Sequence, residues 1–201
     1  MPTERQDMDY PGHYQSQILD AIQTIDLAKV SRVIQLFKSA RAHGQRIFVC
    51  GSGGTDAMAS QFLCEMVKSA GQNRSSRFRI LALTDQSPII AAIRDDFRNE
   101  RVFVEQLKNF AEPEDVVMGI CTSGDTSSVV NAIEYASWIG CRTIGITGCE
   151  GGEVARLAEL TIQVPVCHPG SIEDVHMIIC HMIGYYFVDF EKAEHGDERS
   201  R

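Results

Sequence analysis

The chain has 201 residues, of which 44% are hydrophobic, and this is enough to bury one full core and predicts a single α/β domain. Its formal net charge of −8 argues against a general nucleic-acid or anionic-membrane binder, because both need a basic surface. No apolar run reaches the roughly 20 residues of a membrane span, and the polar first residues are unlike a secretory signal, so we expect a cytoplasmic protein.

The N-terminal part of the chain is predicted to be an arm followed by two helices. Residues 1–12 mix charges with prolines and show no helical period, which predicts a flexible arm. Apolar residues recur at helical spacing over 13–26 and over 27–43, and Gly44 ends the second helix. A helical hairpin before the first strand has no place inside a simple α/β unit. We therefore expect it to pack on another subunit or to cover a pocket.

The central stretch begins with the apolar run Ile47 to Cys50, which predicts a buried parallel strand. Glycines then allow a sharp turn and close approach of a ligand, and polar side chains can cap the next helix. The exposed N–H groups of such a turn favour an anion. The residues of this turn are Ser52, Gly53, Gly54, Thr55 and Asp56.

A second strand and polar turn follow the same plan. Residues 115–121 are predicted to be a strand, and its turn combines one glycine with hydroxyl and carboxylate side chains. Because the carboxyl ends of parallel strands meet at one edge of a sheet, the two turns are expected to form one crevice. The residues of the second turn are Thr122, Ser123, Gly124, Asp125, Thr126 and Ser127.

The remaining segments complete an alternating pattern of strands and helices. Strands are expected over 79–84, 142–147 and 160–165, which predicts a five-stranded parallel sheet with helices on both faces. The last long helix begins with a cap at Ser171 and is apolar on nearly all sides, which indicates a partner helix in an oligomer. Residues 194–201 are predicted to be a frayed tail.

The seven cysteines are interpreted as reduced core residues. Their number is odd, they lack zinc-ribbon spacing, and Cys50, Cys64, Cys121 and Cys180 lie within apolar runs.

Polar residues on the predicted helices are the candidates for chemistry. Gln61 and Glu65 are four residues apart and share one helix face. Glu173 and His181 are eight apart, about 12 Å along their helix, so they could converge only partly. The spacing alone does not show which of these residues form a site, because an exposed Glu65 and a hydrogen-bonded core His181 fit the pattern equally well.

Three segments in this order resemble the sugar isomerase (SIS) domain, and specifically its phosphoheptose isomerase group: GSGGTDAMASQF, ICTSGDTSSVVNAIEYA and TIGITGCEGGEVARLAELTIQVP. The resemblance covers nearly the whole chain and implies one SIS domain over 13–193, built as a five-stranded parallel α/β sandwich with an N-terminal helical hairpin. It also implies a homotetramer that binds sugar phosphates at subunit interfaces.

The resemblance places the phosphate on the turn after the third strand, at Thr122, Ser123 and Thr126, helped by Thr55. It aligns Asp96 with a family acid that is expected to orient sugar hydroxyls. Asp125 stands where the family usually has asparagine. Since an acid beside a dianion is unfavourable, we expect Asp125 to point away or to find a cation.

The resemblance also implies a divalent metal, usually zinc in the family. The family's four ligand positions align with Gln61, Glu65, Glu173 and His181. Two types are altered, because Gln61 replaces a histidine and Glu173 replaces a glutamine. This oxygen-rich set can still hold a metal but need not prefer zinc.

The implied reaction is the aldose–ketose isomerisation of sedoheptulose 7-phosphate to D-glycero-D-manno-heptose 7-phosphate through an enediol. The resemblance makes Glu65 the base and His181 its acid partner. Two other functions stay open: a non-catalytic SIS tetramer that binds the replication initiator DnaA, and a sugar-phosphate sensor without turnover. The loss of histidine at Gln61 favours the scaffold.

Overall fold

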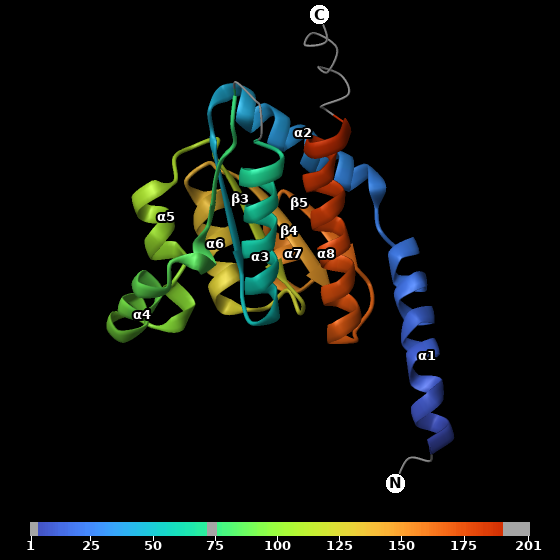
Figure 1. Ribbon diagram of the computed structural model, residues 1–201. Helices are drawn as coiled ribbons and strands as arrows, with labels where there is room; N and C mark the ends of the chain where they lie inside the picture. The colour runs from blue at the N-terminus through green and yellow to red at the C-terminus, as the bar shows by residue number, and fades with distance from the viewer. Residues whose placement is uncertain (1–3, 72–75, 191–201) are drawn as a thin grey trace, which may run out of the picture.

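The computed structural model describes residues 4–71 and 76–190 and contains a five-stranded parallel sheet between two layers of helices (Figure 1). The strand order is β2-β1-β3-β4-β5, so the predicted five-stranded parallel sheet is confirmed. The strands are β1 (Arg46–Gly51), β2 (Arg79–Ala82), β3 (Val116–Cys121), β4 (Arg142–Gly148) and β5 (Leu160–Val164).

The central strands form because their side chains are apolar on both faces. All six residues of β3 are buried, as expected for a parallel strand that helices cover on both sides. Val49, Met118 and Ile144 pair side by side across β1, β3 and β4. The register therefore aligns the carboxyl ends of these strands at one edge.

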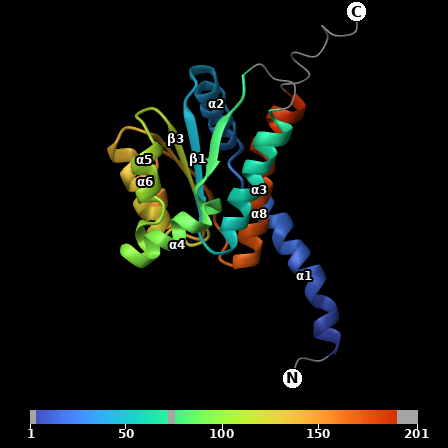
Figure 2. The same cartoon turned by 60° about the vertical axis from the view of Figure 1, so that its left-hand side comes forward.

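The helices divide between the two faces of the sheet (Figure 2). One core contains Phe37, Phe62 and Phe187 and lies under α2, α3 and α8. The other contains Phe48, Leu107 and Ile133 and lies under α5, α6 and α7. The helices are α1 (Glu4–Gln23), α2 (Leu27–His43), α3 (Gly54–Cys64), α4 (Ser87–Asp96), α5 (Val104–Phe110), α6 (Ser127–Trp138), α7 (Gly152–Leu157) and α8 (Pro169–Tyr185).

Helix α1 corrects the prediction of a flexible arm. It runs from Glu4 through Pro11 to Gln23, so the prediction is wrong for residues 4–12. Residues 9–12 are all exposed and therefore give no apolar period from which a helix could be predicted. The helix projects from the body and is anchored to α8, where the Tyr14 hydroxyl donates to Asp174 at 2.8 Å (Figure 1). The predicted domain end at 193 and the tail 194–201 lie outside the described residues.

Two cysteines correct the interpretation that all seven are reduced. Cys149 and Cys167 form a disulfide 18 residues apart, and Cys64 is exposed rather than in the core. Cys149 follows β4 and Cys167 follows β5, so the alignment of these neighbouring strands brings the two side chains together. This alignment is not visible as a spacing motif.

Helix α8 begins earlier than predicted. Its cap is His168, whose Nδ1 accepts the Ser171 N–H at 3.2 Å, so Ser171 is not the capping residue. Pro169 takes the first helical position, where a missing N–H is tolerated. Within the ranges that the structure describes, no helix is both long enough and apolar enough to span a bilayer.

Candidate active site

The two polar turns lie where the sheet topology changes direction. From β1 the chain moves outward to β2 and then returns to β3 on the other side of β1, which is the position where open α/β sheets bind ligands. The Thr55 hydroxyl reaches across to the Ile120 carbonyl of β3, at 2.9 Å. The prediction that the two turns share one edge is thereby confirmed.

Thr55 holds the glycine turn in place. It is 1% exposed, and its Oγ1 accepts the Ser52 N–H at 2.8 Å and lies 3.0 Å from the Ser52 carbonyl. A hydroxyl that is buried and fully engaged is not available to a ligand. As placed, Thr55 holds the turn together, and the expectation that it helps to bind phosphate stays a prediction.

A carboxylate of the same chain, that of Glu173, already lies at the N-terminus of α3. Gly53 precedes the helix with a φ of 68°, and the Glu173 carboxylate packs against Gly54. Exposed N–H groups at a helix N-terminus favour such a negative charge. A phosphate on the glycine turn would have to displace Glu173, so the turn after β3 is the better anion site.

Cys121, which the sequence predicts only as a core residue, organises the turn after β3. Cys121 Sγ accepts the Gly124 N–H at 3.0 Å and lies 3.4 Å from Thr126 Oγ1. Gly124 has a φ of 78°, and a Cβ there would collide with the Gly151 carbonyl, so only glycine fits. The Ser123 hydroxyl accepts the Asp125 N–H at 3.1 Å and is thus partly engaged.

The Asp125 carboxylate has a partner outside the turn. Its Oδ1 accepts the Glu153 N–H, at 2.8 Å, in the first turn of α7. A backbone N–H rather than a cation therefore receives Asp125, and the expectation that it points away from a bound anion stays a prediction.

An open crevice lies between the turn after β3 and the segment that follows α4. Its volume is about 480 Å³, and it narrows into a recess of about 20 Å³ that shares Asn99 and Ser128 with it. Ser52 lines the recess and Thr126 lines the crevice. The crevice is lined by Arg98, Asn99, Glu100, Asp125, Thr126, Ser127 and Ser128.

Of the predicted substrate-binding residues, Thr126 lines the crevice and Ser52 lines its recess, whereas the others line neither. Asp96 is the exposed last residue of α4, and Thr122 and Ser123 are not among the residues that line the crevice. Arg98, Asn99 and Ser128 line the crevice but are not among the residues predicted from the sequence. Arg98 and Asn99 belong to the charged segment after α4, but a charged segment of this kind is equally expected for a solvated loop.

Glu65 and His181 meet in a second polar centre, between α3 and α8. His181 Nε2 lies 3.0 Å from Glu65 Oε1, and the same oxygen accepts the Gln61 Nε2–H at 3.1 Å. The α3 helix widens into a π-helical turn at Glu65, where the Ala70 N–H bonds to the Glu65 carbonyl at 3.0 Å. Such turns are frequent at functional sites.

Burial distinguishes the two members of this pair. Glu65 is 7% exposed, and its second oxygen, Oε2, is buried without a hydrogen-bond partner among the described residues. Oε2 faces Gly184, where an added Cβ would lie 3.2 Å away. The His181 side chain is 43% exposed, with the Tyr185 ring against its edge. Solvent therefore reaches the imidazole, whereas Oε2 of the carboxylate is shielded from it.

Residues 12–148 match the model of the SIS domain. The chain belongs to the SIS family. A phosphoheptose isomerase of Geotalea daltonii is 32% identical over 171 residues, covering 85% of this chain and 88% of that protein. One of Citrifermentans bemidjiense is 35% identical over 167 residues, covering 83% and 86%.

Solved structures of SIS proteins share the fold. A phosphoheptose isomerase from Francisella tularensis superposes with a TM-score of 0.81 at 20% identity and covers 93% of this chain and 98% of its own. The enzyme from Neisseria gonorrhoeae gives 0.82 at 23% identity, covering 90% and 97%. The predicted resemblance to phosphoheptose isomerases is confirmed.

The four predicted metal ligands of this SIS chain are divided between two places. Gln61, Glu65 and His181 are together, whereas Glu173 lies against Gly54, about 12 Å along α8 from His181. Across the described parts of the chain, no three His, Cys, Asp or Glu side chains converge as metal ligands do. Gln61 and His181 both direct N–H groups at one oxygen. The residues as placed therefore do not fit a zinc site.

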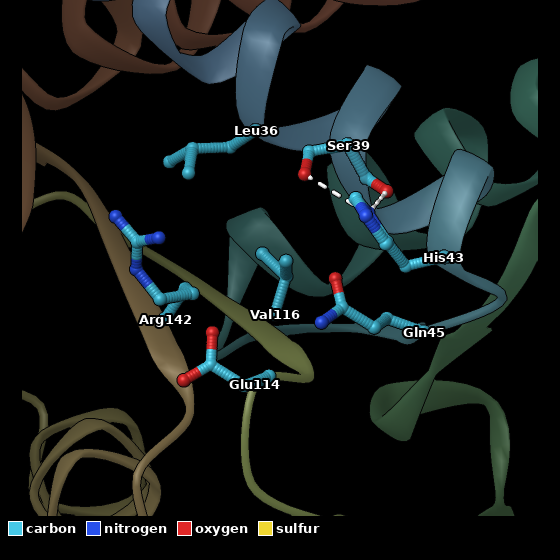
Figure 3. A pocket seen from close by; sticks show the side chains of 7 residues that line it. All are labelled: Leu36, Ser39, His43, Gln45, Glu114, Val116 and Arg142. Carbon is cyan, nitrogen blue, oxygen red and sulfur yellow. Dashed lines mark hydrogen bonds between the residues drawn. The ribbon is translucent and has the colours of Figure 1, made fainter.

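A second hollow lies at the opposite, amino-terminal edge of the sheet (Figure 3). It has a volume of about 270 Å³, but its basic side chains have partners. His43 Nδ1 lies 2.9 Å from the Ser39 carbonyl, and Arg142 forms a two-point ion pair with Glu159 that raises the pKa of the guanidinium. The hollow is lined by Leu36, Ser39, His43, Gln45, Glu114, Val116 and Arg142.

Proposed function

We propose that this SIS protein is a cytoplasmic, homotetrameric aldose–ketose isomerase that converts sedoheptulose 7-phosphate to D-glycero-D-manno-heptose 7-phosphate. The names of its relatives support the reaction class. The contact between Glu65 and His181 carries the proposal, because it joins a carboxylate to a solvent-facing imidazole. This pairing is suited to moving a proton between adjacent carbons.

The hydrogen bond to Glu65 defines the role of His181. A carboxylate that accepts from Nε2–H leaves the Nδ1 lone pair free in the neutral ring. Nδ1 then removes a proton from C1 of the ketose, and the C–H electrons form the C1=C2 bond of an enediolate with its negative charge on O2. A proton passes from the O1 hydroxyl to O2, and the imidazolium returns its proton to C2 as O1 becomes the aldehyde oxygen. Glu65 stabilises the imidazolium during the transfer.

This assignment exchanges the roles expected from the resemblance. Glu65 was expected to act as the base, but one of its oxygens accepts two hydrogen bonds and the other is buried. Glu65 therefore orients and stabilises His181, and His181 contacts the substrate. Because the donor set does not fit zinc, no step of this scheme is assigned to a metal.

The separation of the two polar centres supports a site shared between subunits. Glu65 lies 11 residues after Gly54, which places it about 16 Å along α3 from the edge of the sheet where both polar turns lie, and this exceeds the length of an extended seven-carbon sugar phosphate. The pair of one subunit and the phosphate turn of another would complete each site. Val67, Tyr185 and Phe190 are large apolar residues near the pair and are 51%, 46% and 68% exposed, as an interface between copies requires.

The test is isomerisation of sedoheptulose 7-phosphate, followed by NMR, with wild type and two variants, Glu65→Gln and His181→Gln. Both variants are expected to lose turnover while remaining folded. Glu105→Gln is the matched control, because Glu105 is a helical surface residue paired with Arg101 and Lys108. Absence of turnover in wild type, together with binding of DnaA, would instead support the scaffold function.

Mixed oligomers test the sharing of the site. A Glu65→Gln subunit mixed with a Thr126→Val subunit should regain part of the activity that each variant lacks alone. Lack of recovery in mixed tetramers would contradict a site built from two copies.

A further inference from the structure

We propose that Cys149 and Cys167 form a site of thiol–disulfide exchange, through which a dithiol reductant controls how firmly the substrate is bound. The two residues form a disulfide between the loop after β4 and the segment that follows β5. The effect on the substrate rests on the proposed function, whereas the exchange itself rests on the disulfide and its surroundings. From the sequence, both cysteines are expected only as reduced core residues.

The disulfide is the part of the cysteine set that thiols in solution can reach. Cys167 is exposed and Cys149 is half-buried. Four of the free cysteines are buried, and burial raises the pKa of Cys141 and Cys180 to about 12, so their thiols stay protonated and unreactive. Cys64 is exposed but belongs to no disulfide. In the described chain, an attacking thiol therefore meets the disulfide at Cys167.

A dithiol balances the exchange reaction. One thiolate of the reductant attacks Cys167 Sγ, which forms a mixed disulfide and releases Cys149 as a thiolate. The second thiol of the reductant then displaces Cys167, and the reductant leaves with an internal disulfide. Two electrons pass from the dithiol to the protein, and its two protons end on the two cysteine thiols. Disulfides of cytoplasmic proteins, the location proposed above, are usually of this exchangeable kind.

The loop that contains Cys149 supports the turn after β3 from behind. The Gly148 N–H donates to the Thr122 carbonyl at 3.1 Å. The Gly151 carbonyl lies so close to Gly124 that an added Cβ there would collide with it. The turn that is the better anion site therefore keeps its shape only while this loop stays in place.

The loop is held in an unfavourable backbone conformation. Cys149 has a φ of 45°, and Gly151 and Gly152 have φ values of 88° and 57°. Residues other than glycine rarely adopt this left-handed conformation, which persists only where neighbouring structure imposes it. The Cys149 N–H donates to the Val166 carbonyl at 3.0 Å, and the Cys149 carbonyl accepts the Gln163 Nε2–H at 2.6 Å. Loss of the disulfide leaves hydrogen bonds alone to hold Cys149 in place.

The other end of the disulfide adjoins the cap of α8. Cys167 directly precedes His168, whose Nδ1 accepts the Ser171 N–H at 3.2 Å. His181 lies about 20 Å along α8 from this cap. Reduction should therefore disturb binding at the edge of the sheet and leave the proton-transfer pair in place.

Alkylation in graded dithiothreitol buffers, followed by mass spectrometry, tests the exchange in the native wild type. Cys149 and Cys167 should become alkylated together without denaturant. The melting temperature should then fall by about 5–10 °C, because the disulfide no longer closes a loop of 18 residues. Alkylation of the pair only in denaturant would overturn the proposal, and so would two free thiols at these positions in protein purified without reductant.

Kinetics of the oxidised and the reduced protein measure the effect on the substrate. Reduction should raise KM for sedoheptulose 7-phosphate about three- to tenfold with kcat nearly unchanged, because the binding turn loosens while the pair stays intact. The double variant Cys149→Ser with Cys167→Ser should behave like reduced wild type, with or without dithiothreitol. Cys64→Ser removes an exposed free thiol and is the matched control, which should keep the full response.

The outcomes distinguish this inference from the proposed function. If wild type isomerises the sugar and reduction leaves KM unchanged, the control of binding is refuted while the function stands. If reduction weakens binding of the sugar phosphate in calorimetry but neither form isomerises it, the function fails and the exchange site stands. Equal responses of wild type and the double variant to dithiothreitol would show that another group reacts, and would refute the site.

Discussion

The two polar centres of this protein differ in how far the fold completes them. Between α3 and α8, Glu65 and His181 are already bonded to each other, and Gln61 adds a further hydrogen bond. In the crevice, the side chains of Arg98 and Ser128 form no hydrogen bond or ion pair with the described residues. The difference agrees with the proposal that Glu65 and His181 act together as a pair that is already assembled in the folded chain.

The hollow at the amino-terminal edge of the sheet shows why a cavity alone does not identify a site (Figure 3). Arg142 and His43 line it, but both are satisfied by groups of the same chain. Unpaired donors, rather than volume, distinguish the crevice at the carboxyl edge.

Removing the carboxylate of the pair should have the largest effect. Glu65→Gln keeps the size of the side chain but cannot stabilise an imidazolium, so kcat should fall about 10²- to 10⁴-fold. Steady-state kinetics with circular dichroism checks this expectation. A folded variant that retains half of the wild-type rate would show that the Glu65 carboxylate is not needed for turnover, and the two centres would then not differ in the way described.

His176, a buried histidine of α8, should make the free energy of unfolding depend on pH. His176 is fully buried, and burial lowers its pKa to about 4, with the Thr147 backbone offsetting a small part of the shift. The unfolded chain binds a proton below about pH 6.5 and the folded chain only near 4. The free energy of unfolding should therefore decrease as the pH falls between these values, by about 3 kcal/mol.

Urea unfolding of wild type and His176→Leu at neutral and acidic pH measures this dependence. The variant should lose that part of the acid sensitivity, whereas His13→Gln, at an exposed position, should retain it. Equal acid sensitivity in wild type and His176→Leu would show that His176 does not stay neutral in the fold.

Thr55 tests which side chains belong to the scaffold of the crevice. Thr55→Val removes a buried hydroxyl that bonds to Ser52 and Ile120, so the free energy of unfolding should decrease by about 1–3 kcal/mol. Chemical denaturation measures the change. Unchanged stability with weakened phosphate binding would return Thr55 to the ligand-binding set.

The contact of Glu65 with Gly184 tests how closely α8 must approach the pair. A Cβ at Gly184 would lie 3.2 Å from Glu65 Oε2 and should displace the carboxylate from His181. Gly184→Ala should lower kcat about tenfold, because small displacements of catalytic groups are costly. Gly12→Ala, where an added Cβ meets nothing within 4 Å, is the control and should not change kcat.

Asp125 should give the smallest effect. Asp125→Asn keeps an oxygen for the Glu153 N–H and removes one negative charge from the crevice. Phosphate affinity should rise a few-fold, with a larger gain at low ionic strength. A loss of affinity measured by calorimetry would show that Asp125 supports the anion site through its charge.

The strands and turns were predictable because buried parallel strands are continuous apolar runs, and β3 shows this along its whole length. The contact of Glu65 with His181 was not predictable from spacing, since it depends on how α3 packs on α8. Arg98 was missed because a charged connection also matches a solvated loop. Ser128 was missed because its burial is set by the segment after α4, which packs over it only in the folded chain.

Solvent exchange during turnover tests the central claim of proton transfer through His181 most directly. Sedoheptulose 7-phosphate isomerised in D₂O should give an aldose that carries deuterium at C2, because the proton on an exposed imidazole exchanges with solvent. Neither Glu65→Gln nor His181→Gln should form this labelled product. An unlabelled product from wild type would indicate direct hydride transfer between the carbons and would contradict the account.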